Sequence, residues 1–543
     1  MTDSPDRVYV GRIFTGSRAM PWAEAVAIGG ARVVAIGRIG DVLSQAPQGV
    51  EVIELGSRLM SPAFEDAHIH VLEGSLFYLD CDLHDIPAEG YAAAVAMRVA
   101  ELPDGAWLRG GGWSMAAFGP SGPLAQDLDV LTGDRPAYLT ARDGHSAWVN
   151  TAVLQRAGID AHTPDPEGGI IVRDERGNPT GTLHETAMKL ASRLLPAYSP
   201  QDRLQAILMG QQRLLEAGIT GWCEARVDPD MIPVWRDFAS HGDRVSRVSL
   251  AQHWNPALGM DQLDGILAAR EEFDAANGVA ASSVKLFVDG ILENGTAALH
   301  ESYCGCPGER GRPLFTPEEV NEVTRACASH GLQMHFHAIG DRAVSMALDA
   351  CEAARRDSGD RDLRHQIAHI QVVRPSDLSR FAALGVLPNA QALWACRDEQ
   401  MTSLCLPALG PERGDWQYPF RSLVSEGAAL VMGSDWRVSS FNPLEQIQVA
   451  VTRQPLGSPH SDPLVTDQRL DVMDAMLAFT SGSARANHHE DSGELLPGML
   501  ADYVILDRDP FSVPASEIAD ITVMETAREG RIVFSNQGEG ARV

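Results

Sequence analysis

The stretch FEDAHIHVLEG, residues 64–74, places Asp66, His68 and His70 at alternate positions of a short apolar run. Alternate residues of a β-strand share one face, so the two imidazoles would point in the same direction. Two interpretations are open for this run alone: a pair of neighbouring core histidines, or half of a metal site.

Four later runs also carry residue types that bind metal ions. They are SVKLFVDG (283–290) with Lys285 and Asp289, LQMHFHAIGD (332–341) with His335 and His337, RHQIAHIQ (364–371) with His365 and His369, and ALVMGSDW (429–436) with Asp435. Strand-like and helix-like segments alternate between them, which favours a parallel sheet and, as its commonest closed form, a (β/α)8 TIM-like barrel. The C-terminal ends of barrel strands meet at one mouth, so distant residues can surround one ion. The later runs therefore favour a metal site for His68 and His70.

The two ends of the chain have a different sequence pattern, with short Val- and Ile-rich runs separated by glycines. We expect residues 1–60 and 487–543 to form one small β-sandwich domain. Residues 61–486 would form the barrel, with an insertion at about 85–210, where glycine, proline and helical patterns are enriched. Within the barrel, Thr316 followed by Pro317 predicts the start of a helix.

Composition excludes several classes of protein. The 543-residue chain has a formal net charge of −29 and a pI near 4.9, and no basic patch suggests nucleic-acid binding. No apolar run reaches the roughly 18 residues of a membrane span, and the first residues lack a secretory signal pattern. Eight scattered cysteines, of which only Cys304 and Cys306 are close together, favour reduced thiols and a cytoplasmic location.

Taken in order, these motifs resemble the amidohydrolase superfamily (amidohydrolase family 3), in particular the branch typified by N-substituted formamide deformylase. The resemblance extends over nearly the whole chain. It includes GRIFTG (11–16), SPAFEDAHIH (61–70), DGHSAWVN (143–150), GNPTGTLHETA (177–187), HFHAIGDRAV (335–344), MGSDWRV (432–438) and GMLADYVILDRDPF (498–511).

The resemblance implies a set of metal ligands at the strand ends: His68, His70, Lys285, His337, His369 and Asp435. It implies one or two divalent ions, with Zn²⁺ expected, and in binuclear members the lysine is carboxylated by CO2 and bridges both ions. The chain departs from the family pattern at Ala63, Ala368 and Trp436. Ala368 removes a carboxylate that many relatives have before the sixth-strand histidine, which bears on the orientation of His369.

Carboxylation of Lys285 requires a neutral amine. An unperturbed lysine is neutral in only about one part in 10³ to 10⁴ at pH 7, and burial or a neighbouring cation would raise that fraction. We therefore expect Lys285 to be buried.

The function implied is hydrolysis of an amide-type C–N bond in a small organic substrate by metal-activated hydroxide, on N-substituted formamides or other N-substituted or cyclic amides. Asp435 would act as general base and then acid. His145 would contact the carbonyl or the leaving group, or else anchor a loop. A deaminase or an ester or carbamate hydrolase remains an alternative, and a non-catalytic binding protein a weaker one. Relatives are commonly homodimers.

Aromatic residues near strand ends are candidates for the wall of a pocket for an apolar or aryl substrate. They are Trp113, Phe118, Trp254, Trp394 and Trp436. Substrate contact is assigned to Trp113, His145 and Trp436. The long polar connection 293–315 is interpreted as a lid. His335 is assigned a structural or supporting role, because its neighbour His337 already occupies the ligand position.

Overall fold

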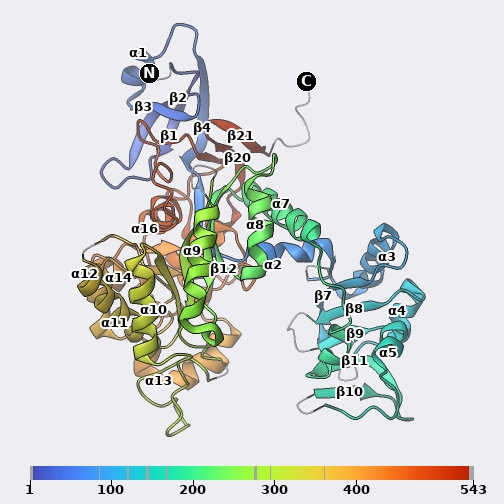
Figure 1. Cartoon of the computed structure of the whole chain (residues 1–543). Helices are drawn as coiled ribbons and strands as arrows, with labels where there is room; N and C mark the ends of the chain where they lie inside the picture. The colour runs from blue at the N-terminus through green and yellow to red at the C-terminus, as the bar shows by residue number, and fades with distance from the viewer. Residues whose placement is uncertain are drawn as a thin grey trace. The chain divides into compact units, whose positions relative to one another are not determined.

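A computed structural model describes residues 4–84, 86–118, 122–141, 146–166, 169–273, 278–293, 295–359 and 361–536 (Figure 1). The chain divides into two compact units. Unit 1 comprises Met1–Val71 and Gly210–Val543, and unit 2 comprises Leu72–Met209.

Unit 1 contains an eight-stranded sheet, counted over the described residues, in which all neighbouring strands are parallel. Its strands are, in spatial order, β18 (Val431–Met432), β17 (Leu387–Ala390), β16 (Gln366–His369), β15 (Gln333–Ala338), β14 (Val279–Phe287), β13 (Arg247–His253), β12 (Ile219–Val227) and β5 (Phe64–Ile69). The order follows the sequence except at β5, which comes first in the chain and lies at the edge beside β12. In a closed (β/α)8 barrel the first and last strands are neighbours, and this order places β5 and β18 at the two edges that would meet.

Backbone hydrogen bonds join the two outer strands of this sheet. The amide of Asp435, just after β18, donates to the carbonyl of His68 in β5 at 2.7 Å, and the amide of His70 donates to the carbonyl of Trp436 at 2.9 Å. Gly433 lies where a Cβ atom would approach the backbone nitrogen of His68 to 2.4 Å. The sheet is therefore a nearly closed barrel. The close approach of β18 and β5, called the seam below, depends on Gly433, which has no side chain.

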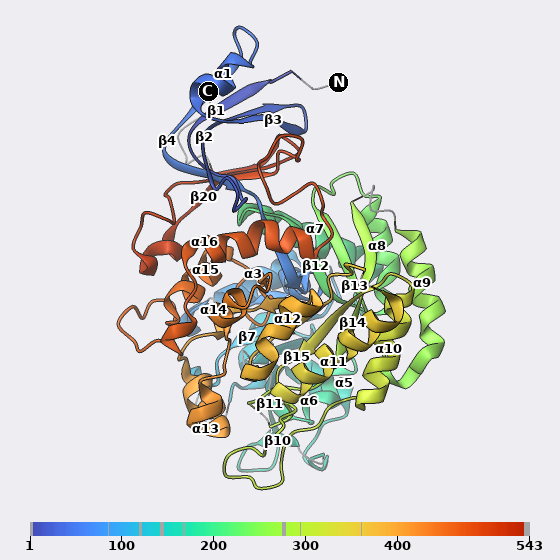
Figure 2. The ribbon, with the colours of Figure 1, turned by 90° about the vertical axis from the view of Figure 1, so that its left-hand side faces the viewer.

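Helices cover the outside of the barrel strands, as Figure 2 shows for α8–α12. The helices of this layer and of the last part of the barrel are α8 (Ile232–Ala239), α9 (Leu263–Glu272), α10 (Pro317–Ser329), α11 (Asp341–Ser358), α12 (Leu378–Leu384), α13 (Leu406–Gly414), α14 (Phe420–Ser425), α15 (Pro443–Thr452), α16 (Val472–Leu477) and α17 (Ser483–Ala486). The predicted start of α10 is confirmed: the Thr316 hydroxyl accepts a hydrogen bond from the amide of Glu319, whose carboxylate accepts one from the amide of Thr316.

Strands from both ends of the chain form a second sheet in unit 1. In spatial order they are β21 (Arg531–Ser535), β20 (Val523–Arg528), β19 (Tyr503–Leu506), β4 (Glu51–Pro62), β1 (Arg7–Phe14), β2 (Trp22–Gly29) and β3 (Arg32–Gly37). The sheet is mixed, because β1 and β4 are parallel while the other pairs are antiparallel. Helix α1 (Ile39–Ser44) follows β3. The β-sandwich form and the domain limits of the sequence analysis stay predictions.

Unit 2 has its own sheet, with the order β10 (Gly169–Arg173), β11 (Pro179–Glu185), β9 (Ser146–Val149), β8 (Ala137–Ala141), β7 (Leu108–Trp113) and β6 (Cys81–Asp82). Helices α3 (Tyr91–Glu101), α4 (Ala125–Thr132) and α5 (Thr151–Ala157) lie along one face of it (Figure 1). The unit begins at Leu72, directly after the His68–His70 strand and earlier than the predicted start of the insertion near residue 85. The sequence pattern there indicated an insertion rich in glycine, proline and helix, but it did not indicate this sheet.

None of the helices in the described ranges has both the length and the hydropathy that a membrane span requires. All eight cysteines belong to those ranges, and each is free of a disulfide bond.

Candidate metal centre

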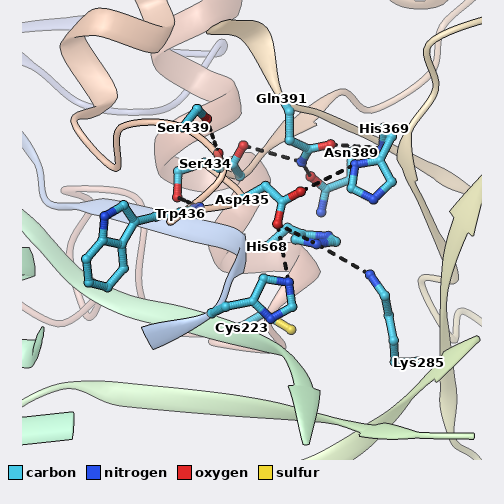
Figure 3. A network of polar contacts seen from close by, with 12 residues as sticks. His68, Cys223, Lys285, His369, Asn389, Gln391, Ser434, Asp435, Trp436 and Ser439 are labelled. Carbon is cyan, nitrogen blue, oxygen red and sulfur yellow. Dashed lines mark hydrogen bonds and ion pairs between the residues drawn. The ribbon is translucent and has the colours of Figure 1, made fainter. Parts of the chain in front are cut away.

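Strand β5 delivers the first two histidines of the site. His68 is 1% exposed and the side chain of His70 is 17% exposed, and the two ring centroids lie 5.5 Å apart. The Nε2 atom of His68 lies 3.5 Å from the carboxylate of Asp435 (Figure 3). The Nε2 atom of His70 lies 3.3 Å from the same carboxylate. The alternation of the sequence thus places both imidazoles on the inner face of the barrel.

Asp435 reaches this position from the turn after β18. The carboxylate of Asp66 accepts hydrogen bonds from the amides of His68 (2.9 Å) and Ser434 (3.1 Å), so it fastens the end of β18 to β5. The second carboxylate oxygen of Asp435 lies 3.9 Å from Nδ1 of His369. One carboxylate therefore faces three histidines from two strands.

Lys285 and His337 complete the group from the neighbouring strands β14 and β15. Nζ of Lys285, a residue that is 1% exposed, lies 3.4 Å from Nε2 of His68. The ring of His337 lies 4.4 Å from that of His369, centroid to centroid, and its Nε2 is 3.3 Å from the carbonyl oxygen of Gly290. All six predicted ligands thus gather at the C-terminal ends of the barrel strands.

His369 is held by neighbours that the sequence analysis did not identify. Its amide donates to Oε1 of Gln391 at 2.9 Å, and the Gln391 amide group donates to Asn389 at 2.9 Å. The indole of Trp394 stacks on the His369 ring, with centroids 5.3 Å apart and planes 15° from parallel. These contacts hold the backbone and one ring face of His369 in the absence of a carboxylate at position 368.

Burial and charge determine the protonation of these groups. Burial lowers the pKa of His68 to about 3 and that of His337 to about 4, with the charge of Lys285 acting in the same direction. Burial also lowers the pKa of Lys285 to about 8. Burial alone would raise the pKa of Asp435, but His68, His70 and His369 hold it well below its ordinary value. At neutral pH His68 and His337 are therefore neutral and Asp435 is ionised, which are the forms that bind metal ions.

The residues fit a divalent metal ion. One ligand atom from each of His68, His70 and Asp435 lies within 4.8 Å of the others, a spacing that one ion can bridge. Nδ1 of His369 is buried without a hydrogen-bond partner among the described residues. Imidazole nitrogen and carboxylate oxygen are donors that zinc prefers.

Sequence comparison supplies the family. The sequence profile described as "Amidohydrolase family" matches residues 51–534, which is most of the chain. The chain belongs to the amidohydrolase family.

Relatives of this amidohydrolase are similar over nearly their full lengths. Protein LONG AFTER FAR-RED 3 of Arabidopsis thaliana is 31% identical over 94% of this chain and 89% of its own. N-substituted formamide deformylase of Arthrobacter pascens is 25% identical over 95% and 96%. Among solved structures, an uncharacterized metal-dependent hydrolase from Pyrococcus horikoshii OT3 is 26% identical with a TM-score of 0.74, covering 94% of this chain and 99% of that one. The resemblance found in the motifs is confirmed, and the chain is a hydrolase of this superfamily.

The three residues assigned to substrate contact lie in different surroundings. His145 falls outside the described residues. Trp113 is fully buried in unit 2, where its indole nitrogen donates to the carbonyl of Leu139 at 2.8 Å. Trp436 is 9% exposed, packs against Phe441 at 5.2 Å, and points away from Lys285 and His369 in Figure 3. Substrate contact by these residues stays a prediction.

Of the remaining aromatic candidates, Trp394 stacks its ring on a predicted ligand, His369. Trp254 is 1% exposed and contacts Lys285 through its backbone amide, which donates to the Lys285 carbonyl at 2.9 Å. Phe118 packs on Trp113 within unit 2. Trp394 and Gln391 follow strand β17, in LPNAQALW. The alternation of Asn389 and Gln391 at the end of β17 could have indicated two amide side chains that point inward.

The segment that joins β14 to the predicted lid (293–315) contains a buried anchor, Asp289. Its carboxylate accepts hydrogen bonds from the amides of Ala298 (2.8 Å), Ile339 (3.0 Å) and Gly340 (2.9 Å). The loop after β14 is thereby tied to the end of β15, beside His337. Its opening and closing stays a prediction.

Proposed function

We propose that this amidohydrolase is a metal-dependent enzyme that cleaves an amide-type C–N bond of a small organic molecule, with N-substituted formamides and other N-substituted or cyclic amides as the substrate class. The observation that carries the proposal is the meeting of six potential ligand side chains at one end of the barrel, with Asp435 facing three histidines. The similarity to N-substituted formamide deformylase supports the choice of substrate.

Zn²⁺ is the ion we propose, with His68, His70, His337, His369, Lys285 and Asp435 as its ligands. A bound zinc ion supplies a water of lowered pKa and polarises a carbonyl group. Lys285 would serve either as an amine or, after its nitrogen bonds to the carbon of CO2 and releases a proton, as a carbamate. With a pKa of about 8, roughly one part in ten of Lys285 is neutral at pH 7. Burial therefore favours the neutral amine that carbamate formation requires.

Asp435 is the residue that would transfer the proton. The residue is 6% exposed, and its ionised carboxylate lies within 3.5 Å of two imidazoles, so it is a base held at the metal-binding end of the barrel. It can take a proton from the attacking water and deliver it to the leaving nitrogen, which must be protonated to depart as an amine. Trp394, stacked on His369 and only partly buried, offers an apolar face for the N-substituent.

The test combines metal analysis with a substrate panel. Protein purified with zinc present is assayed for metal content and then for hydrolysis of N-aryl and N-alkyl formamides, linear amides, cyclic imides, aminopurines and carbamate esters, read by mass. We expect at least one equivalent of zinc and turnover in the amide group. Turnover confined to aminopurines or carbamates would move the assignment to deamination or ester cleavage, and fewer than half an ion per chain would contradict the metal enzyme.

Two variants separate binding from chemistry. His68→Ala should lose both zinc and turnover, whereas Asp435→Ala should keep much of the zinc and lose turnover by about 10²-fold or more, as removal of a general base does. Asp474→Asn is the matched control, because Asp474 is a buried carboxylate paired with Arg421 away from the barrel mouth. Near-normal turnover of Asp435→Ala would contradict the proton-carrier role.

A further inference from the structure

A buried chain of three side chains continues inward from the ligand group. Nδ1 of His68 lies 2.8 Å from Nε2 of His335, and Nδ1 of His335 lies 3.8 Å from the sulfur of Cys223. His335 is fully buried and Cys223 is 1% exposed. The chain crosses three strands, since His68 is in β5, His335 in β15 and Cys223 in β12.

The two nitrogens of His68 have different tasks. Nε2 faces the metal-binding side, 3.5 Å from the Asp435 carboxylate and 3.4 Å from the Lys285 amine. A neutral imidazole has one N–H, so Nε2 keeps its lone pair for a metal ion only when the hydrogen is on Nδ1. That Nδ1–H then needs an acceptor, because an unsatisfied buried donor is unfavourable.

The geometry assigns this acceptor. We infer that His335 is a positioning residue that accepts a hydrogen bond from His68 Nδ1–H and thereby fixes both the ring orientation and the metal-binding tautomer of His68. The inference rests on the proposed metal-dependent function. In this tautomer His335 carries its own hydrogen on Nδ1, which points at the Cys223 sulfur, a weak acceptor.

The strand register explains why His335 can do this. His335 pairs with Lys285 across β14 and β15, and His337 pairs with Phe287. His335 and His337 therefore point to the same inner face, with His335 two residues further from the mouth. One histidine supports a ligand, and the next belongs to the ligand group.

Zinc affinity tests the inference without measuring turnover. The full-length parent and its variants are stripped of metal, and their Zn²⁺ dissociation constants are measured by competition with a chromophoric chelator. His335→Phe removes the acceptor and should weaken zinc binding about 10- to 100-fold, the range typical of lost supporting hydrogen bonds. His335→Gln can place an amide oxygen near the former Nε2 and should stay within about threefold of the parent.

A second pair of variants protects the test against simple misfolding. His335→Asn is polar but too short to reach His68, so it should resemble His335→Phe rather than His335→Gln. His365→Phe is the matched control: Nδ1 of His365 accepts a hydrogen bond from the amide of Met334 at 2.9 Å, a contact on the same sheet that involves none of the six ligands. It should leave the zinc affinity unchanged. Far-UV circular dichroism of each metal-free variant reports its fold.

Cobalt gives an independent readout. The visible absorption of Co²⁺ in the parent reports ligand geometry, and it should change in His335→Phe and His335→Asn but not in His335→Gln. Zinc affinities of the Phe and Asn variants within twofold of the parent would overturn the inference, as would equal losses in the Gln variant and in the His365 control. If the parent itself binds no zinc, the proposed function fails instead, so the two failures are distinguishable.

Discussion

His369 and Asp435 both occupy the left-handed region of backbone conformation, with φ of 78° and 50°. Non-glycine residues rarely adopt this conformation, and when they do they are concentrated at functional sites that hold them by other interactions. Here the amide of His369 is bonded to Gln391 and the amide of Asp435 to the carbonyl of His68. Two predicted ligands therefore leave their strands at turns that the barrel interior stabilises.

Glu65 illustrates a second buried residue that depends on its neighbours. It lies on β5, is 1% exposed, and its carboxylate is 2.6 Å from Nδ1 of His489 and accepts from the side-chain amide of Asn487 at 2.9 Å. Burial alone would raise the pKa of Glu65, but His489 and Arg247 bring it below its ordinary value of 4.5. The ionised form is therefore the one that stabilises the fold.

We expect Glu65→Gln to lower the free energy of unfolding by about 2 kcal/mol at pH 7, because it removes a buried charged partner. Since the folded-state pKa lies below 4.5, the stabilisation by Glu65 is fully present above pH 4.5 and is lost as the pH falls through the folded-state value. Urea unfolding at pH 7 and at several values below 4.5 measures the difference. A difference that stays constant over this range would contradict the role of the charge.

At the scale of elements, the site depends on where β18 meets β5. The short strand β18 ends at Met432, and Gly433 lets the following turn approach the backbone of His68 closely enough for Asp435 to face the histidines. A side chain at position 433 would have no room, although the backbone there does not require glycine. Glycine at position 433 is therefore explained by the close approach of β18 and β5 and not by the backbone conformation of the turn.

Gly433→Ala should separate β18 from β5, reduce stability by about 1–3 kcal/mol through overpacking, and weaken zinc binding at least tenfold by displacing His68, whose backbone the new Cβ atom would meet. Thermal melting and chelator competition measure the two effects. Gly265→Ala is the control, because a Cβ atom at this position in α9 meets nothing within 4 Å. It should leave zinc binding unchanged and raise stability slightly, since alanine favours helices. Unchanged zinc affinity in Gly433→Ala would contradict the importance of the seam.

The sequence predicted the features of this structure that depend on a regular period or on a local signal. The alternation of His68 and His70 predicted a shared strand face, and Thr316-Pro317 predicted the start of α10. The roles of Lys285 and Asp435 as metal ligands came from the family resemblance. These residues are far apart in the chain, and sequence periodicity does not show which distant residues meet in space. Gln391 was missed since it acts by bonding the His369 amide, a contact that depends on which strands are neighbours.

At the scale of the whole molecule, the two ends of the chain are joined in one sheet that packs on the barrel within unit 1. The hydroxyl groups of Tyr9 and Tyr503 lie 2.5 Å apart although 494 residues separate them. Arg247, in barrel strand β13, extends to the same region and contacts Asp502, just before β19, at 2.6 Å, and Asp491 at 2.9 Å. A charged side chain of the barrel therefore binds the segment that leads into the terminal sheet.

Arg247→Met should destabilise unit 1 by about 3–5 kcal/mol, because it leaves the nearly buried carboxylate of Asp502 without its cation. Adding Asp502→Asn to Arg247→Met should recover part of this loss, since the uncompensated charge is then removed as well. Arg325→Met is the control for an exposed pair, with Asp357 at 2.9 Å and both side chains about half exposed, and should cost less than about 1 kcal/mol. Urea unfolding followed by circular dichroism measures all three. A double variant less stable than Arg247→Met alone would mean that Asp502 stabilises the fold through its hydrogen bonds to Ser492 and to the amide of Glu529 more than through Arg247.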